Sequence, residues 1–126
     1  MDDLFIEKTR HSPGIKFEKE SQILSIIGNS LLEDPIAFYA PVFKWLDDYE
    51  TDPLSLLKFV FKFNIIITSS NKMIFELMIR IKDMVAKDLN IEIEWQYPED
   101  DEDLEELGEL FKETINVPFQ LVSYGE

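Results

Sequence analysis

The spacing of hydrophobic residues along the chain changes between a strand period of two and a helix period of three to four. The clearest alternation places every second residue on one face, with Leu57, Phe59, Phe61, Phe63 and Ile65. The spacing then becomes helical from about Ser70 to Leu89, with an apolar stripe of Met73, Ile74, Leu77, Met78, Ile81, Met84 and Val85. A period of two predicts a strand, and a period near 3.6 predicts an amphipathic helix. The sequence therefore predicts a buried strand followed by the longest helix of the chain.

The remaining segments are shorter and follow the same two periods. Strands are predicted at Gly14 to Phe17, Ile23 to Ile27, Ile91 to Tyr97 and Val117 to Val122, and helices at Asp34 to Tyr49 and Leu104 to Phe111. Asp34 and Pro35 form a helix-start signal, because aspartate caps exposed backbone donors and proline tolerates the first helical position. Pro41 removes an internal hydrogen bond, so we expect a kink or a later effective start in that helix.

The predicted order of elements is ββαβαβαβ, in a single domain that covers residues 1–126. Strand-helix-strand units imply parallel strands joined by right-handed crossovers, whereas the short charged connection between the first two strands predicts a hairpin. The expected fold class is therefore α/β, with a mixed, mainly parallel sheet packed with three helices. The chain is long enough, and at 45% hydrophobic residues apolar enough, to bury a core of its own.

Charge and cysteine content narrow the classes of function. The chain carries 12 Lys and Arg against 26 Asp and Glu, a formal net charge of -14. Nucleic acids and anionic membranes are bound chiefly through basic residues, so we expect neither as a partner. The absence of cysteine excludes thiolate catalysis and disulfides, and one histidine, His11, does not make a multi-histidine metal site. The acidic N-terminus and the lack of a long apolar run predict a cytoplasmic protein.

Acidic residues concentrate near the C-terminus. Between Glu99 and Glu113, nine acids stand against one base, Lys112. Hard cations favour carboxylate oxygens, but this segment lacks the mid-loop glycine and the terminal glutamate of an EF-hand calcium loop. A solvated loop that leads into a helix with acids at its positive end is the simpler interpretation. We predict no metal and no cofactor, and a metal-dependent hydrolase built on these carboxylates is the disfavoured alternative.

Three successive hydroxyl residues, Thr68, Ser69 and Ser70, mark the junction between the apolar strand and the long helix. One hydroxyl suffices to cap a helix, and capping is the ordinary role of such residues. Three in a row also form a surface that a kinase can reach. A phosphate there would meet the positive helix end, free backbone N–H groups and Lys72. The residues alone leave both interpretations open, and capping is the more common one.

Short motifs in a fixed order extend from this junction over most of the chain. They are Gly28, Ser30 and Glu33; Phe38-Tyr39, Pro41-Val42, Trp45-Leu46 and Tyr49; Thr68-Ser69-Ser70 with Lys72; Trp95-Gln96-Tyr97; Gly108-Glu109 with Phe111; and Pro118-Phe119. From Ser12-Pro13 to about Tyr124, the chain resembles the SiaC family of bacterial regulatory phosphoproteins. The fold of that family is similar to the STAS-like domains of anti-sigma-factor antagonists.

The resemblance implies a partner switch rather than an enzyme. In the family, a dedicated kinase phosphorylates the threonine of the Thr-Ser-Ser motif, and a PP2C-type phosphatase removes the phosphate. The unphosphorylated form binds and activates a diguanylate cyclase, which raises cyclic-di-GMP and favours biofilm formation. Carried onto this chain, the resemblance makes Thr68 the phosphosite, with Ser69, Ser70, Asn71 and Lys72 around it on the recognition surface.

Two residues ahead of the motif depart from the family pattern. The family usually has an aromatic residue and an asparagine where this chain has Ile65 and Ile67. The approach to Thr68 is therefore more apolar here. An anti-sigma-factor antagonist of the same fold, with a different protein partner, is the alternative binding hypothesis.

Overall fold

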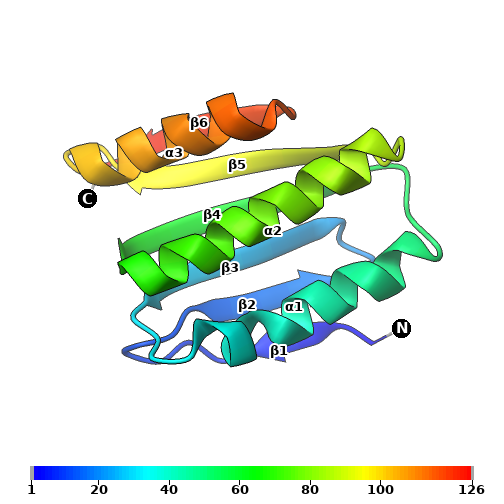
Figure 1. Ribbon diagram of the computed structural model, residues 1–126, viewed down its shortest axis with the longest axis horizontal. Coiled ribbons are helices and arrows are strands. Elements are labelled where there is room, and N and C mark those ends of the chain that lie inside the picture. Colours follow the sequence, from blue (N-terminus) through cyan, green and yellow to red (C-terminus); the bar gives the residue numbers. More distant parts are fainter. Residues whose placement is uncertain (1, 126) are drawn as a thin grey trace.

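Six strands form one mixed sheet in the computed structural model, which describes residues 2–125 (Figure 1). They lie in chain order across the sheet: β1 (Leu4–Ile6), β2 (Gly14–Glu18), β3 (Ile23–Ser30), β4 (Leu57–Ile66), β5 (Ile91–Pro98) and β6 (Phe119–Tyr124). The first two pairs are antiparallel, and the three pairs from β3 to β6 are parallel. The predicted mixed, mainly parallel sheet is confirmed.

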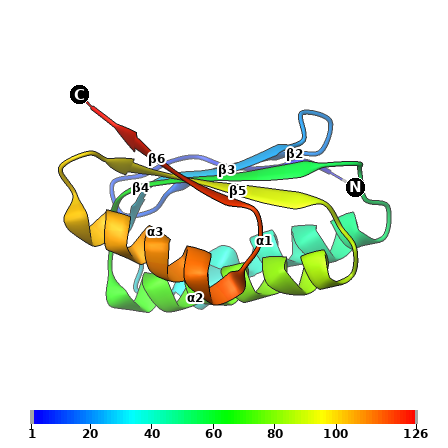
Figure 2. The ribbon, with the colours of Figure 1, turned by 90° about the horizontal axis from the view of Figure 1, so that it is seen from above.

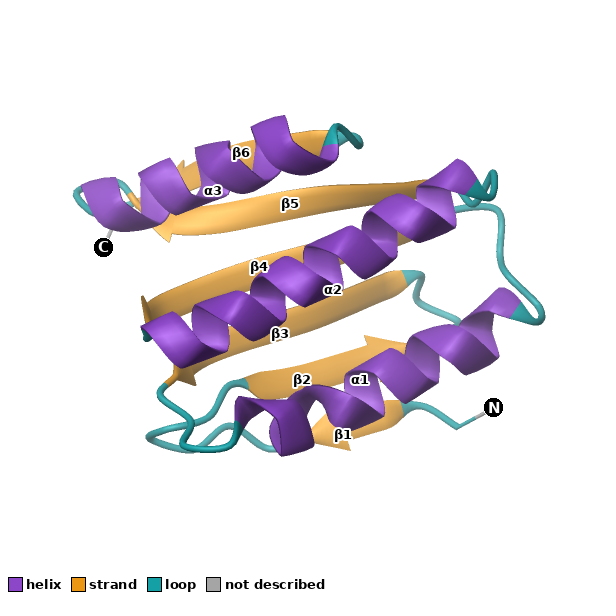
Figure 3. Ribbon diagram, in the orientation of Figure 1, coloured by secondary structure: helices purple, strands orange, loops and turns teal. Residues whose placement is uncertain are grey.

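Three helices connect the parallel strands: α1 (Pro35–Glu50), α2 (Thr68–Ala86) and α3 (Glu102–Ile115). All three cover the same face of the sheet (Figure 2). Consecutive parallel strands joined by crossovers of one hand place every helix on one side, which explains the two layers. The helices pack in chain order, with α2 between α1 and α3 (Figure 3). Within residues 2–125, no helix is long and apolar enough to span a membrane.

The core lies between the sheet and the helices, with β4 at its centre. From Leu57 to Phe63, every second residue of β4 is buried under the helices: Leu57, Phe59, Phe61 and Phe63. Ile65, which the alternation placed on the same face, is exposed instead. Aromatic rings continue this layer into β5, where the centroid of Trp95 lies 5.8 Å from those of Phe61 and Phe63. The predicted stripe of α2 covers these rings, although Met73 and Val85 at its margins are only partly buried.

The hydrophobic pattern does not predict β1, because three residues are too few to establish a period. Tertiary contacts stabilise this strand instead. Leu4 pairs with Phe17, and both Leu4 and Ile6 pack against the core. The indole Nε1 of Trp45 also donates a hydrogen bond to the Asp2 carbonyl oxygen at 3.1 Å. From Gly14 onward, the observed order of elements agrees with the predicted one.

Helix α1 begins where the sequence predicts. The Asp34 side chain accepts a hydrogen bond from the Ala37 N–H at 3.2 Å, which confirms the cap. The helix continues through Pro41 as one segment. Its buried face contains Tyr39, whereas the neighbouring Phe38 is half-buried.

Candidate functional site

The junction between β4 and α2 lies at the edge of the sheet where the parallel strands end (Figure 1). Ile67 is extended, and Thr68 begins the helix. The Ile67 N–H donates to the Ser30 carbonyl oxygen at 3.1 Å, and the Asn71 N–H donates to the Ile67 carbonyl oxygen at 2.9 Å. Because the first of these bonds crosses to β3, the start of α2 is fixed to the end of a neighbouring strand.

A β-bulge in β4 sets the position of that bond, because Gly28 pairs with Phe63 and Asn29 with Ile65, which leaves Asn64 as the extra residue. The pairing of β3 with β4 shifts between Gly28 and Asn29, and Ser30 then pairs with Ile66. Gly28 has a φ of 128°, which disfavours residues with a side chain. The hydroxyls of Ser30 and Tyr39 form a buried hydrogen bond of 2.8 Å. Burial raises the pKa of Tyr39 to about 12, despite the opposing effect of the Ser30 hydrogen bond, so this phenol is protonated at neutral pH.

The three hydroxyl residues of the junction have three different environments. Thr68 is exposed. Ser69 is also exposed, and its hydroxyl donates a long hydrogen bond of 3.4 Å to the Leu32 carbonyl oxygen. Ser70 is fully buried, and its hydroxyl has no hydrogen-bond partner among the described residues. No side chain of residues 2–125 caps α2, so the interpretation that one of these hydroxyls is the cap is wrong.

The uncapped start leaves backbone donors of α2 available to another acceptor. The first N–H groups of a helix have no partner within the helix, and the residue at the cap position, Ile67, has no side-chain acceptor. An anion at this position also meets the positive end of the helix dipole. Lys72 is exposed one turn further along the helix. The start of α2 therefore suits a negatively charged group on Thr68.

Two adjoining hollows open beside Thr68 between α2 and α3. The first, of about 380 Å³, is lined by Asn64, Ile65, Ile66, Thr68, Asn71, Asp101, Asp103, Leu104 and Leu107. The second, of about 430 Å³, is lined by Thr68, Asn71, Lys72, Phe75, Glu76, Leu107, Leu110 and Phe111. Thr68, Asn71 and Leu107 line both. We call the two hollows together the Thr68 groove.

Exposed apolar side chains lie along the Thr68 groove. Ile65 at one end is 52% exposed and Leu110 at the other is 56% exposed, and Phe75 between them is also exposed. Ile67, beside Thr68 in the chain, is exposed as well. Gathered apolar side chains on a surface, rimmed by polar ones, mark sites of protein interaction. The groove therefore has the chemical character of a binding surface.

A glycine allows α3, one wall of the groove, to lie close against the sheet. A Cβ atom at Gly108 would lie 2.5 Å from Cδ1 of Trp95 and 2.7 Å from Cδ2 of Leu121. The indole Nε1 of Trp95 donates to the Leu104 carbonyl oxygen at 3.0 Å. Asp101 caps α3 by accepting a hydrogen bond from the Leu104 N–H at 3.0 Å. These contacts fix the first turns of α3, which line the groove.

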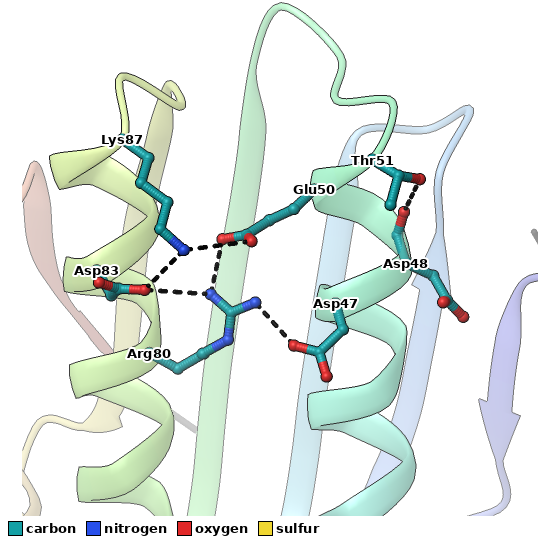
Figure 4. A network of polar contacts seen from close by, with 7 residues as sticks. All are labelled: Asp47, Asp48, Glu50, Thr51, Arg80, Asp83 and Lys87. Atoms are coloured by element: carbon teal, nitrogen blue, oxygen red, sulfur yellow. Dashed lines mark hydrogen bonds and ion pairs between the residues drawn. The ribbon is translucent and has the colours of Figure 1, made fainter.

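The other wall, α2, is held to α1 by a network of ion pairs in its C-terminal half (Figure 4). Arg80 contacts Glu50 at 2.8 Å and Asp47 at 2.9 Å, and Lys87 contacts Glu50 at 3.5 Å. The hydrogen bond from Arg80 lowers the pKa of Glu50. Arg80 and Lys87 also contact Asp83 of α2. The network joins the two helices at residues that do not line the groove.

The structure brings together only part of the predicted recognition surface. Asn71 and Lys72 line the Thr68 groove, whereas Ser69 faces the loop after β3 and Ser70 is buried. Among residues 2–125, no three His, Asp or Glu side chains are grouped so that they could hold a metal ion.

Sequence reasoning missed the contribution of α3 to this site. Asp101 and Asp103, from the segment expected to be solvated, line the same hollow as Thr68. Leu110, one of the apolar residues in the helix predicted at Leu104 to Phe111, also lines the groove. A signal was available, because Leu104, Leu107 and Phe111 already complete an apolar stripe and leave Leu110 as an extra apolar residue.

The family model for SiaC family regulatory phosphoproteins matches residues 6–124. This chain belongs to the SiaC family. The resemblance read from the motifs is thereby confirmed. Among curated proteins, uncharacterized protein PA14_02130 of Pseudomonas aeruginosa (strain UCBPP-PA14) is 25% identical over 126 residues, which is 100% of both chains.

Solved structures of this family have the same fold as this chain. Apo-SiaC from Pseudomonas aeruginosa is 24% identical, with a TM-score of 0.89 over 98% of this chain and 100% of that one. A chain in the crystal structure of the diguanylate cyclase SiaD in complex with its activator SiaC, also from Pseudomonas aeruginosa, is 24% identical. Its TM-score is 0.90, over 97% of this chain and 100% of that one.

Proposed function

We propose that this protein is a non-enzymatic switch in which phosphorylation of Thr68 controls binding to, and activation of, a diguanylate cyclase. The observation that carries the proposal is the position of Thr68, exposed at an uncapped helix start and on an apolar groove. Membership in a family of regulatory phosphoproteins supports the modification. The cyclase SiaD, which has a SiaC as its activator, supports the class of partner. A kinase and a PP2C-type phosphatase would set the state of Thr68 in the cytoplasm.

The phosphate would act by blocking the interface. Burying an unpaired dianion against an apolar surface costs several kcal/mol, and each 1.4 kcal/mol or so lowers affinity tenfold. A penalty of about 3 kcal/mol would therefore reduce cyclase binding about a hundredfold. The apolar residues that would receive the partner, Ile65, Phe75 and Leu110, all lie along the groove that contains Thr68.

The free protein would accommodate the same phosphate without refolding. Thr68 is exposed, so the phosphate remains in water and within reach of the free N–H groups at the start of α2. The helix dipole contributes typically 0.3–1 kcal/mol to such a contact, which is small beside the cost of burial. Phosphorylation is therefore expected to change binding far more than it changes the fold.

The first experiment maps the modification. The protein is incubated with its kinase and ATP, and phosphate is located by mass spectrometry. We expect incorporation at Thr68 and none in Thr68→Ala. Ser69→Ala is the matched control, because Ser69 is also exposed but does not line the groove. Incorporation at another residue, with Thr68 unmodified, would refute the assignment.

The second experiment measures binding of the phosphorylated and unphosphorylated protein to a purified diguanylate cyclase, together with cyclase activity. We expect Leu110→Ser to weaken binding of the unphosphorylated protein at least tenfold, the loss expected when an exposed interface leucine is removed. Phe5→Ser is the control, because Phe5 is 59% exposed, lies on the edge strand β1 and lines neither hollow of the Thr68 groove. Binding to an anti-sigma-factor kinase, and not to a cyclase, would favour the alternative partner.

A further inference from the structure

The hollow that contains Thr68 also contains two carboxylates. Asp101 and Asp103 line it from the start of α3, opposite the residues that β4 and α2 contribute. We propose that these two aspartates disfavour a phosphate on Thr68 and thereby increase the loss of effector affinity that phosphorylation causes. The inference rests on the proposed function of Thr68. It assigns to Asp101 and Asp103 the role of setting how strongly phosphorylation of Thr68 weakens effector binding.

Asp101 is held in place by the fold. Its carboxylate accepts the capping hydrogen bond from the Leu104 N–H, and the residue is half-buried. It therefore cannot turn away from a phosphate without uncapping α3. Asp103, in the first turn of the same helix, is exposed and lines the same hollow.

The other charged residues near Thr68 do not cancel these two. Lys72 and Glu76, both on α2, line the second hollow and offset each other in formal charge. The end of β4 contributes only neutral residues to the groove. In the loop that Ser69 contacts, Glu33 and Asp34 line neither hollow. A phosphate on Thr68 is therefore surrounded by negative charge on the α3 side, and the groups that favour an anion lie only at the start of α2.

The closure of an interface would amplify this repulsion. The Coulomb energy of two unit charges about 8 Å apart changes an equilibrium constant about twofold in water. At the lower effective dielectric constant near a protein surface, the same energy changes it about thirtyfold. In the free protein, water screens the phosphate from the aspartates. When a partner covers the groove and excludes that water, the same pair of carboxylates opposes the phosphate much more strongly. The aspartates therefore penalise the phosphorylated complex more than the phosphorylated free protein.

The test is the second pKa of the phosphate, measured by phosphorus NMR on protein in which phosphothreonine is installed at position 68 during synthesis. Neighbouring carboxylates disfavour the dianion, so removing them lowers this pKa, which is about 6 for an exposed phosphate. In Asp101→Asn with Asp103→Asn, we expect the pKa to fall by about 0.5 at low ionic strength. Asparagine retains the ability to cap α3.

The matched control is Asp100→Asn with Glu102→Gln. It removes the same two charges from the same segment, but neither residue lines the Thr68 groove. We expect the pKa change in this control to be less than half of the change in the Asp101→Asn, Asp103→Asn variant. Equal changes in the two variants, or no change in either, would overturn the inference.

The result of this NMR test does not depend on whether the proposed function is correct. Installed phosphothreonine needs no kinase and the NMR titration needs no partner, so a missing kinase or cyclase interaction would refute only the proposed function. Where the cyclase does bind, the ratio of its affinities for unphosphorylated and phosphorylated protein should fall about tenfold in the Asp101→Asn, Asp103→Asn variant. An unchanged ratio would also overturn the inference.

Discussion

The N–H of Ile67 donates a hydrogen bond to the carbonyl oxygen of Ser30 at 3.1 Å, so the residue before α2 is bonded to the end of β3. Thr68 is the next residue, and its place on the surface follows from this bond rather than from any contact of its own side chain. The helix start is held by backbone, and the Thr68 hydroxyl is left free of a capping role. A modification of that hydroxyl therefore does not have to break the helix start.

Replacement of Thr68 should leave stability almost unchanged. Because its hydroxyl does not cap α2, Thr68→Ala should alter the free energy of unfolding by no more than about 0.5 kcal/mol. Asp34→Ala is the positive control, since Asp34 does cap α1 and its loss should cost about 1 kcal/mol. Urea denaturation measures both. A loss of about 1 kcal/mol in Thr68→Ala would contradict the uncapped start.

Replacement of Ser70 should stabilise the protein. Its hydroxyl is buried without a partner among the described residues, and an unsatisfied buried hydroxyl costs about 1–3 kcal/mol. Ser70→Ala removes this cost, and alanine is also the better helix former. We expect a gain of about 1 kcal/mol in thermal or urea unfolding. Ser69→Ala, at an exposed position, should change little, and a clear loss of stability in Ser70→Ala would show that the hydroxyl has a partner.

A side chain at position 108 should destabilise the protein and displace one wall of the groove. The added methyl of Gly108→Ala would overlap the Trp95 ring, and overpacking of this kind costs about 1–3 kcal/mol. The better helix propensity of alanine offsets about 1 kcal/mol of that. We expect a net loss of up to about 2 kcal/mol, together with weaker partner binding. Glu109→Ala, exposed on the same helix, is the control, and a gain in stability with unchanged partner binding in Gly108→Ala would contradict the close packing.

The Arg80 network should stabilise the protein above acidic pH. Hydrogen bonding from Arg80 lowers the pKa of Glu50 in the folded state. The stabilisation from this interaction is therefore complete above the pKa of glutamate in the unfolded chain, about 4.3. The stabilisation is lost as the pH falls through the lower pKa of Glu50 in the folded state. Wild type should exceed Glu50→Gln by about 0.5–1 kcal/mol at pH 7. The difference should be smaller at pH 3, below the unfolded-state pKa, than at pH 7.

The control for this pH dependence is Glu20→Gln, which changes an exposed glutamate in the turn between β2 and β3. Its stability should follow that of wild type at both pH values. A difference between wild type and Glu50→Gln that persists unchanged at pH 3 would show that packing, and not the ion pair with Arg80, is the cause.

Local periodicity was sufficient to predict most of the fold. The alternation in β4 and the stripe of α2 each extend over enough residues to establish a period, and both were confirmed except at Ile65, which follows the bulge at Asn64 and is exposed. Strand β1 was not predictable in this way, because its three residues become a strand only through pairing with β2 and packing against the core. Similarly, the cap of α1 is local and was predicted, whereas the absence of a cap on α2 depends on which residue begins that helix.

That starting residue decided the roles of the three hydroxyls. The pattern placed the helix start near Ser70, but α2 begins at Thr68. A helix turns by about 100° per residue, so Ser70, four residues before the buried Ile74, falls on the buried face of α2, and Thr68, about 200° away from Ser70, falls on the other side. Ser70 consequently points into the core, and Thr68 onto the surface.

The sequence by itself determined the class of fold, the excess of acid and the motif that contains Thr68, because these depend on composition and on residues close together in the chain. Only the tertiary structure decided what surrounds Thr68. Parallel strands β4 and β5 end at the same edge of the sheet, and the helices that follow them therefore begin there together. This arrangement brings Asp101 and Asp103 into the hollow beside Thr68, across more than thirty positions of sequence that no local pattern connects.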